Sequence, residues 1–78
     1  MTGEVMELNE AEITIGDVRL SQAEAMTVRV ALSSFIMRMA EEGLGNEAHG
    51  KEMTRLYLQH SRRVERLLVD DIHARGGR

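Results

Sequence analysis

The sequence predicts an α+β fold dominated by helix, in which an N-terminal β-hairpin leads into an antiparallel two-helix hairpin. Three observations predict this fold. β-Branched residues surround a Gly-Asp pair, a helix start signal follows directly, and two long segments repeat apolar residues at helical spacing. The chain of 78 residues contains no proline, and its length fits a single domain, so we expect residues 1–78 to form one unit.

Residues 1–20 are expected to form an extended segment followed by the hairpin. Residues 5–8 are a candidate extended piece, and residues 13–20 place β-branched side chains on both sides of Gly16 and Asp17. Gly-Asp is typical of a two-residue type I′ or type II′ turn. Because an isolated hairpin is marginally stable in water, we expect it to pack against the helices or to extend a sheet in a second copy. The glutamates of residues 4–12 are interpreted as a solvated strand edge.

The first helix is predicted over residues 21–43. Ser21 and Glu24 match the capping box, and Gly43 with Gly45 supplies a stop signal. The apolar residues of this helix cover a wider arc than the roughly 100° that a surface helix buries. They form a first stripe of Ala25, Val28, Leu32, Phe35 and Met39. A second set, called the methionine stripe below, comprises Met26, Val30, Met37 and Ala40.

The second helix is predicted over residues 46–73, with Asn46 as its cap and residues 74–78 as a flexible tail. The short link at residues 43–45 predicts that the two helices run antiparallel. The apolar residues of this helix repeat at i, i+3 and i+4 on one narrow face, which is the predicted core face. It comprises Met53, Leu56, Tyr57, His60, Val64, Leu67 and Leu68.

The methionine stripe is the main reason to expect self-association. One second helix cannot cover two apolar faces of the first helix, so the second face is expected to meet another copy or a partner. The chain has no cysteine, which excludes disulfides and leaves oligomerisation as a source of extra stability for a small core. We therefore predict a homo-oligomer, most simply a dimer with a four-helix arrangement, in which Met26, Val30, Met37 and Ala40 form the interface.

A basic stripe on the second helix is the most suggestive polar feature, and it comprises Lys51, Arg55, Arg62 and Arg66. Guanidinium groups bind phosphate in a bidentate manner, so the stripe is a candidate nucleotide site. The favoured interpretation is a solvated face, because Glu47–Lys51, Glu52–Arg55 and Arg66–Asp70 all have the spacing of local ion pairs.

Arg29 and Ser33 form a polar seam between the two apolar stripes of the first helix. Arg29 could flank an anion at a symmetric interface or pair with a glutamate of a neighbouring copy. The favoured interpretation is that its charged end reaches water past its apolar neighbours. His60 is interpreted as a packed, hydrogen-bonded core residue, with a pH-responsive interface as the alternative.

Composition and motifs argue against several function classes. No serine lies in a nucleophile elbow, and no HExxH pattern occurs, so we expect no catalytic residue, metal or cofactor. The net charge of −3, with one Tyr, one Phe and no Trp, argues against nucleic-acid binding. Neither a membrane span nor a signal peptide is visible, so a soluble cytoplasmic protein is expected.

Residues 13–35 read ITIGDVRLSQAEAMTVRVALSSF. The Gly-Asp hairpin, the Leu-Ser-x-Ala-x-x-Met cap and the Val-Arg-Val-Ala-Leu helix of this segment resemble the opening of short uncharacterised proteins of tailed phages and prophages. The resemblance covers roughly the first half of the chain, implies no specific activity and assigns no residue a role. It implies a class, because small acidic phage proteins often bind and block a host component.

The leading hypothesis is a non-enzymatic phage-type binding protein, an inhibitor that antagonises a host process such as a defence system through a homo-oligomeric helical scaffold. One alternative is an oligomeric sponge that sequesters an anionic nucleotide signal. Another is a structural or assembly accessory of the virion. The candidate residues for binding a ligand or partner are Arg29, Ser33, Arg55, Arg62 and Arg66.

Overall fold

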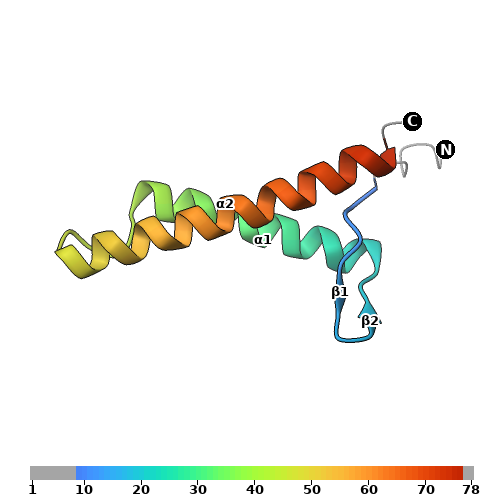
Figure 1. The fold of residues 1–78 in the computed structure, drawn as a ribbon, viewed down its shortest axis with the longest axis horizontal. Coiled ribbons are helices and arrows are strands. Elements are labelled where there is room, and N and C mark those ends of the chain that lie inside the picture. The colour runs from blue at the N-terminus through green and yellow to red at the C-terminus, as the bar shows by residue number, and fades with distance from the viewer. Residues whose placement is uncertain (1–8, 77–78) are drawn as a thin grey trace.

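The computed structural model describes residues 9–76 and contains a small β-hairpin followed by two long helices (Figure 1). The hairpin consists of β1 (Thr14–Ile15) and β2 (Val18–Arg19), and the helices are α1 (Gln22–Glu41) and α2 (Ala48–Gly76). The two helices lie side by side and run in opposite directions (Figure 1). The predicted helix-dominated fold, with a β-hairpin and a helical hairpin, is confirmed. The candidate extended piece at residues 5–8 lies outside the described residues.

The β-hairpin has the predicted turn but not the predicted packing. Thr14 pairs with Arg19 and Ile15 with Val18, in antiparallel register. Gly16 has φ +62°, and Asp17 is not among the residues with positive φ, which selects type II′ over type I′. Ile15 and Val18 remain 64% and 65% exposed, so the first expected alternative, packing against the helices, is wrong. The second alternative, a sheet extended by a second copy, stays a prediction. Its turn projects away from them because β2 leads within three residues into α1 (Figure 1).

Local signals at both ends of α1 act as predicted. The Glu24 amide donates to Ser21 Oγ at 3.1 Å, and the Ser21 amide donates to Glu24 Oε1 at 2.8 Å. At the other end, Gly43 adopts φ +68°, and its amide donates to the Arg38 carbonyl at 3.3 Å. A left-handed glycine just after the last turn is the usual way to satisfy helix carbonyls. These contacts need only neighbouring residues, which is why the sequence reveals them.

The helix α2 differs from its predicted bounds of 46–73 at both ends. It begins at Ala48 and continues to Gly76, so residues 74–76 belong to the helix and not to a tail. Arg75 explains the longer C-terminal end, because its guanidinium pairs with Asp71 one turn earlier and with Glu12 of the N-terminal segment, both at 2.6 Å. These contacts hold the last turn against another part of the chain.

The two helices meet along residues spaced by seven, which we call the heptad seam. A seven-residue repeat keeps one face of each helix toward the other when helices cross at a shallow angle. These residues are buried or half-buried. On α1 they are Ala25, Leu32 and Met39, and on α2 they are Thr54, Ser61 and Leu68. Several of these side chains are small, which allows the helix backbones to approach each other closely.

The inward face of α2 is therefore not the predicted core face. Of the seven residues predicted to form it, only Leu68 is buried, and His60 is exposed instead of packed. Thr54 helps to explain why the face of α2 with small side chains lies against α1. Its hydroxyl donates to the Gly50 carbonyl at 2.8 Å and accepts from the Leu44 amide at 2.9 Å. This short polar side chain joins the interhelical loop to α2, and a bulky apolar side chain could not.

On α1, the first predicted stripe is only partly correct. Ala25 and Met39 are buried and Leu32 is half-buried, but Val28 is exposed. Ile36, which belongs to neither predicted stripe, is buried. The buried arc of α1 is thus rotated slightly from the predicted one, toward Arg29 and Ile36.

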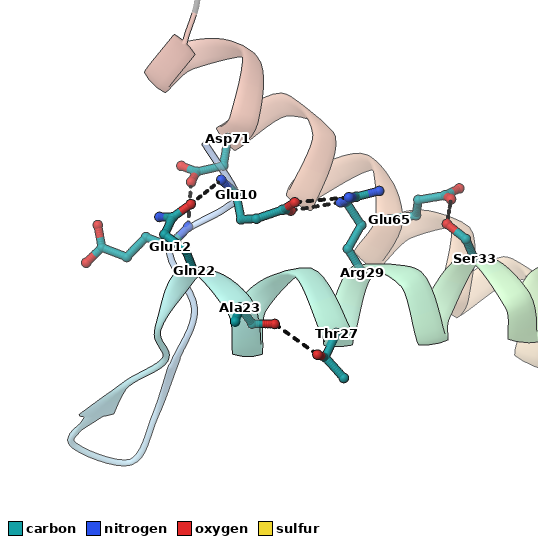
Figure 2. A network of polar contacts seen from close by, with 9 residues as sticks. All are labelled: Glu10, Glu12, Gln22, Ala23, Thr27, Arg29, Ser33, Glu65 and Asp71. Atoms are coloured by element: carbon teal, nitrogen blue, oxygen red, sulfur yellow. Dashed lines mark hydrogen bonds and ion pairs between the residues drawn. The ribbon is translucent and has the colours of Figure 1, made fainter. Parts of the chain in front are cut away.

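Residues 9–13, called the N-terminal segment, cross the open end of the helical hairpin and are anchored by polar contacts (Figure 2). The Glu10 amide donates to Gln22 Oε1 at 2.8 Å, and the Glu12 amide donates to Asp71 Oδ2 at 2.9 Å. Glu10 and Ala11 are buried. The interpretation of these glutamates as solvated is therefore wrong for Glu10. Glu12 is exposed, and its amide and carboxylate connect the segment to α2.

Candidate interaction surfaces

Exposed apolar side chains are the dominant feature of this surface. Among residues 9–76, eleven large apolar side chains are exposed whereas five apolar residues are buried. Single exposed apolar residues are normal on any protein, but contiguous ones mark interaction sites. Ile15 and Val18 belong to the β-hairpin and Leu44 to the interhelical loop, whereas most of the others lie on two different sides of the helix pair.

The first surface spans both helices and is called the aromatic face. It comprises Val28 and Phe35 of α1 with Tyr57, Val64 and Leu67 of α2. The rings of Phe35 and Tyr57 meet edge to face, with centroids 5.8 Å apart and an interplanar angle of 89°. Val28 and Val64 lie seven residues from these rings on the same sides of their helices, and Leu67 follows Val64 by about one turn. The exposed His60 lies on this side of α2 as well.

The methionine stripe lies on the other side of α1. Ser33 and Phe35 are two residues apart, which places them about 200° apart around the helix axis. Met26, Val30 and Met37 flank Ser33 at helical spacing, and they are 45%, 49% and 61% exposed. Ala40 is also exposed. All four predicted residues thus lie on a face of α1 that α2 does not cover.

Arg29 and Ser33 form a polar seam beside the methionine stripe, and both bind groups of the same chain (Figure 2). Arg29 Nε and Nη2 donate to the two carboxylate oxygens of Glu10 at 2.8 and 3.0 Å. Ser33 Oγ donates to Glu65 Oε2 of α2 at 3.0 Å. The structure thus gives Arg29 a carboxylate partner within its own chain, where the sequence suggested water, an anion or a neighbouring copy.

The Glu10–Arg29 pair is the most protected ion pair among the described residues, with side chains 10% and 34% exposed. Hydrogen bonds from the Arg29 guanidinium lower the pKa of the Glu10 carboxyl below its ordinary value of 4.5, although burial acts in the opposite direction. The same bonds raise the pKa of Arg29. The pair is bidentate, which fixes its geometry. Nineteen positions separate the two residues in sequence, so no local pattern could have revealed their contact.

The remaining candidate arginines lie on the outer surface of α2. Arg55 pairs with Glu52 at 2.7 Å, as its spacing predicts. The other two predicted local pairs, Glu47–Lys51 and Arg66–Asp70, do not form in the described part of the chain. Arg62 and Arg66 are exposed. Neither of the two cavities described for residues 9–76 is lined by any of the five candidate binding residues.

A hollow of about 510 Å³ lies where the N-terminal segment crosses the hairpin, and sequence reasoning missed it. Arg19, Arg75 and Gln22 contribute to its lining. Both arginines already face the Glu12 carboxylate, at 3.6 and 2.6 Å. The hydrogen bond from Arg75 also lowers the pKa of Asp71. The charges of the hollow are thus matched by contacts that hold the N-terminal segment in place.

Within residues 9–76, no helix is both long enough and apolar enough to cross a membrane. The same part of the chain contains no group of three histidine or acidic side chains arranged to hold a metal ion. Comparison of the chain with protein-family models, with curated proteins and with solved structures found no match.

Proposed function

We propose that this chain is a non-enzymatic binding protein that engages another protein through the methionine stripe. The observation that supports the proposal is the exposure of Met26, Val30 and Met37 on one face of a capped helix. Methionine side chains are flexible and polarizable, so they adapt to the shape of a protein partner. Next to them, the Glu10–Arg29 and Ser33–Glu65 bonds fix the polar border of the stripe.

The biological form that we propose is a phage-type inhibitor, which antagonises a host process by occupying a surface of a host protein. An inhibitor of this kind needs no catalytic group, since occupying a surface is sufficient. It needs a preformed apolar patch with a polar rim, which is the usual anatomy of a protein–protein interface.

The test is affinity capture from host lysate with three forms of the chain. We expect the wild type and Arg63→Glu to recover the same dominant protein, and Met37→Glu to lose it. Met37 and Arg63 are both exposed on helices, so neither substitution should disturb the fold, and circular dichroism checks this. Equal recovery of that protein by all three forms would contradict a role for the methionine stripe. Repeating the capture with lysate of phage-infected cells tests the assembly-accessory alternative, which a virion protein as the dominant partner would favour.

The nucleotide sponge has weaker support. A sponge requires several arginines that converge on one anion. The Arg29 guanidinium, however, is already hydrogen-bonded to the Glu10 carboxylate. Arg62 and Arg66 remain exposed on α2, and they are the residues on which a sponge would depend. Native mass spectrometry of gently purified protein tests this, because a sponge would carry extra mass in the nucleotide range that Arg62→Glu removes.

A further inference from the structure

We infer that two copies of this chain pack their aromatic faces against each other and form a symmetric four-helix bundle. The inference deepens the proposed function and rests on it in one respect, because the bundle is the scaffold on which the methionine stripe is displayed. It assigns self-association to Val28, Phe35, Tyr57, Val64 and Leu67, and not to the methionine stripe that the sequence predicts as the interface.

The first support is the shape of the single chain. Its principal extents are 51 × 29 × 19 Å, and a helix with its side chains is about 10–12 Å across. The helical hairpin is therefore one layer of two helices, and within residues 9–76 no other helix or strand covers either broad side (Figure 1). Stable domains bury the apolar face of each element against a second layer. A second copy of the hairpin supplies that layer.

The second support is the accessible surface. The chain exposes 5978 Å², whereas a compact monomer of 8.8 kDa is expected to expose about 4800 Å². The excess is roughly 1200 Å², and each partner of a standard protein interface buries about 800 Å². The chain as a whole thus exposes more surface than a compact monomer, by an amount comparable to what one partner of a stable dimer buries.

The third support is the spacing of the face itself. Val28 and Phe35 on α1, like Tyr57 and Val64 on α2, are separated by seven residues. Seven is also the period of the heptad seam, so the aromatic face continues along the bundle without drifting around either helix. Four-helix bundles pack by this repeat. On α1 the methionine stripe shares this spacing, since Val30 and Met37 are also seven residues apart. The two faces differ where the helices meet: the methionine stripe is bordered by the polar pair Ser33 and Glu65, and the aromatic face by two rings in contact.

A second copy also explains the chemistry of the residues on this face. Phe35 and Tyr57 already form one T-shaped pair at 5.8 Å, and a two-fold axis would bring two such pairs into one cluster. Aromatic pairs and tyrosine in particular are favoured at interface centres, because the ring is buried while the hydroxyl reaches the rim. An isologous contact of this kind closes on itself and produces a dimer without a filament.

The experiment compares two matched variants by light scattering after size-exclusion chromatography. Leu67→Glu places a charge on the aromatic face, and Met37→Glu places one on the methionine stripe. Both side chains are largely exposed in the hairpin, at 53% and 61%, so both variants should keep their helical circular dichroism. We expect twice the chain mass for the wild type and Met37→Glu, and the single-chain mass for Leu67→Glu.

A second readout covers the case in which Leu67→Glu fails to fold. Because the chain has no cysteine, one nitroxide label on Asp70→Cys can report only a distance between copies. We expect a defined label-to-label distance in the labelled protein, unchanged by Met37→Glu and lost with the milder change Val64→Ser. A monomeric wild type, or a dimer that Met37→Glu separates and the aromatic-face variants do not, would overturn the inference. Neither result alters the expected loss of the lysate partner by Met37→Glu, so the two proposals fail independently.

Discussion

The Glu10–Arg29 pair joins the N-terminal segment to α1 at a point where both side chains are partly removed from water. A buried or half-buried charge is tolerated only when a partner compensates for its lost hydration. The bidentate contact supplies that compensation, and it also sets the direction in which the chain enters the β-hairpin. The pair is therefore a positioning device for the segment and not an open anion site.

Removing one member of this pair should therefore destabilise the fold. We expect Glu10→Gln to lower the free energy of unfolding by about 1–2 kcal/mol, below the range for fully buried pairs because Arg29 is partly exposed. Urea denaturation measures it. The double variant Glu10→Gln with Arg29→Met should recover part of the loss, since it leaves no unpaired charge. Strictly additive effects would show that the two side chains do not interact.

The lowered pKa of Glu10 also predicts how stability depends on pH. In the unfolded chain this carboxyl titrates near 4.5, and in the folded chain its pKa is lower. The folded state therefore binds the proton less well, so the contribution is fully present above pH 4.5 and is lost as the pH falls through the lowered value. Urea midpoints measured on acidification should fall less steeply for Glu10→Gln than for the wild type. Parallel profiles would contradict this assignment.

At the scale of elements, the sequence predicts what neighbouring residues determine. The capping box at Ser21, the stop at Gly43 and the turn at Gly16 were all predictable, because each depends on a local hydrogen bond or on a positive φ. The inward face of α2 was not predictable from its large apolar residues. It is set by small residues such as Thr54 and Ser61, which a search for hydrophobic periodicity does not detect.

Gly50 is the clearest case of an element-scale constraint. An ideal Cβ on this buried residue would lie 2.6 Å from the Leu44 carbonyl oxygen and 3.1 Å from that of Gly45. Glycine-to-alanine changes inside a helix usually stabilise it by roughly 0.5–1 kcal/mol. Here the loop backbone would have to move, so we expect Gly50→Ala to destabilise the protein by roughly 1–3 kcal/mol. Thermal unfolding measures this, with Ser34→Ala on the exposed side of α1 as a control. An increase in stability would show that the loop yields easily.

For the candidate site, sequence reasoning found the exposed residues but not their grouping. The members of the methionine stripe were identified correctly as uncovered by α2, since the apolar arc of α1 is wider than one neighbouring helix can cover. The aromatic face was missed because Tyr57, Val64 and Leu67 were assigned to the core. Placing them required knowing how far α2 is rotated about its axis, and that rotation is set by contacts between the helices and the loop.

At the scale of the whole molecule, the chain is long and thin for its size. Its radius of gyration is 15.5 Å, whereas a compact domain of 78 residues is expected to have about 11.5 Å. A single layer of this kind has few side chains completely removed from water. Its stability should therefore depend on the second copy that we propose.

This dependence predicts a concentration effect on thermal stability. Dissociation of a folded dimer follows mass action, so the midpoint of thermal unfolding should rise with protein concentration. We expect this rise for the wild type and for Met37→Glu. For Leu67→Glu, the midpoint should be lower and independent of concentration. Differential scanning fluorimetry over a hundredfold concentration range measures it, and a flat wild-type curve would argue for a self-sufficient monomer.

The heptad seam has a further consequence for how the length of this protein can vary. An insertion of seven residues at matching points of α1 and α2 would lengthen the hairpin by about 10.5 Å and leave every inward residue facing inward. An insertion of three or four residues in one helix would turn everything beyond it by roughly 40–60° and separate Phe35 from Tyr57. Natural length variants of this chain should therefore differ in steps of seven residues per helix, with the capping box and the Gly43 turn retained at the ends.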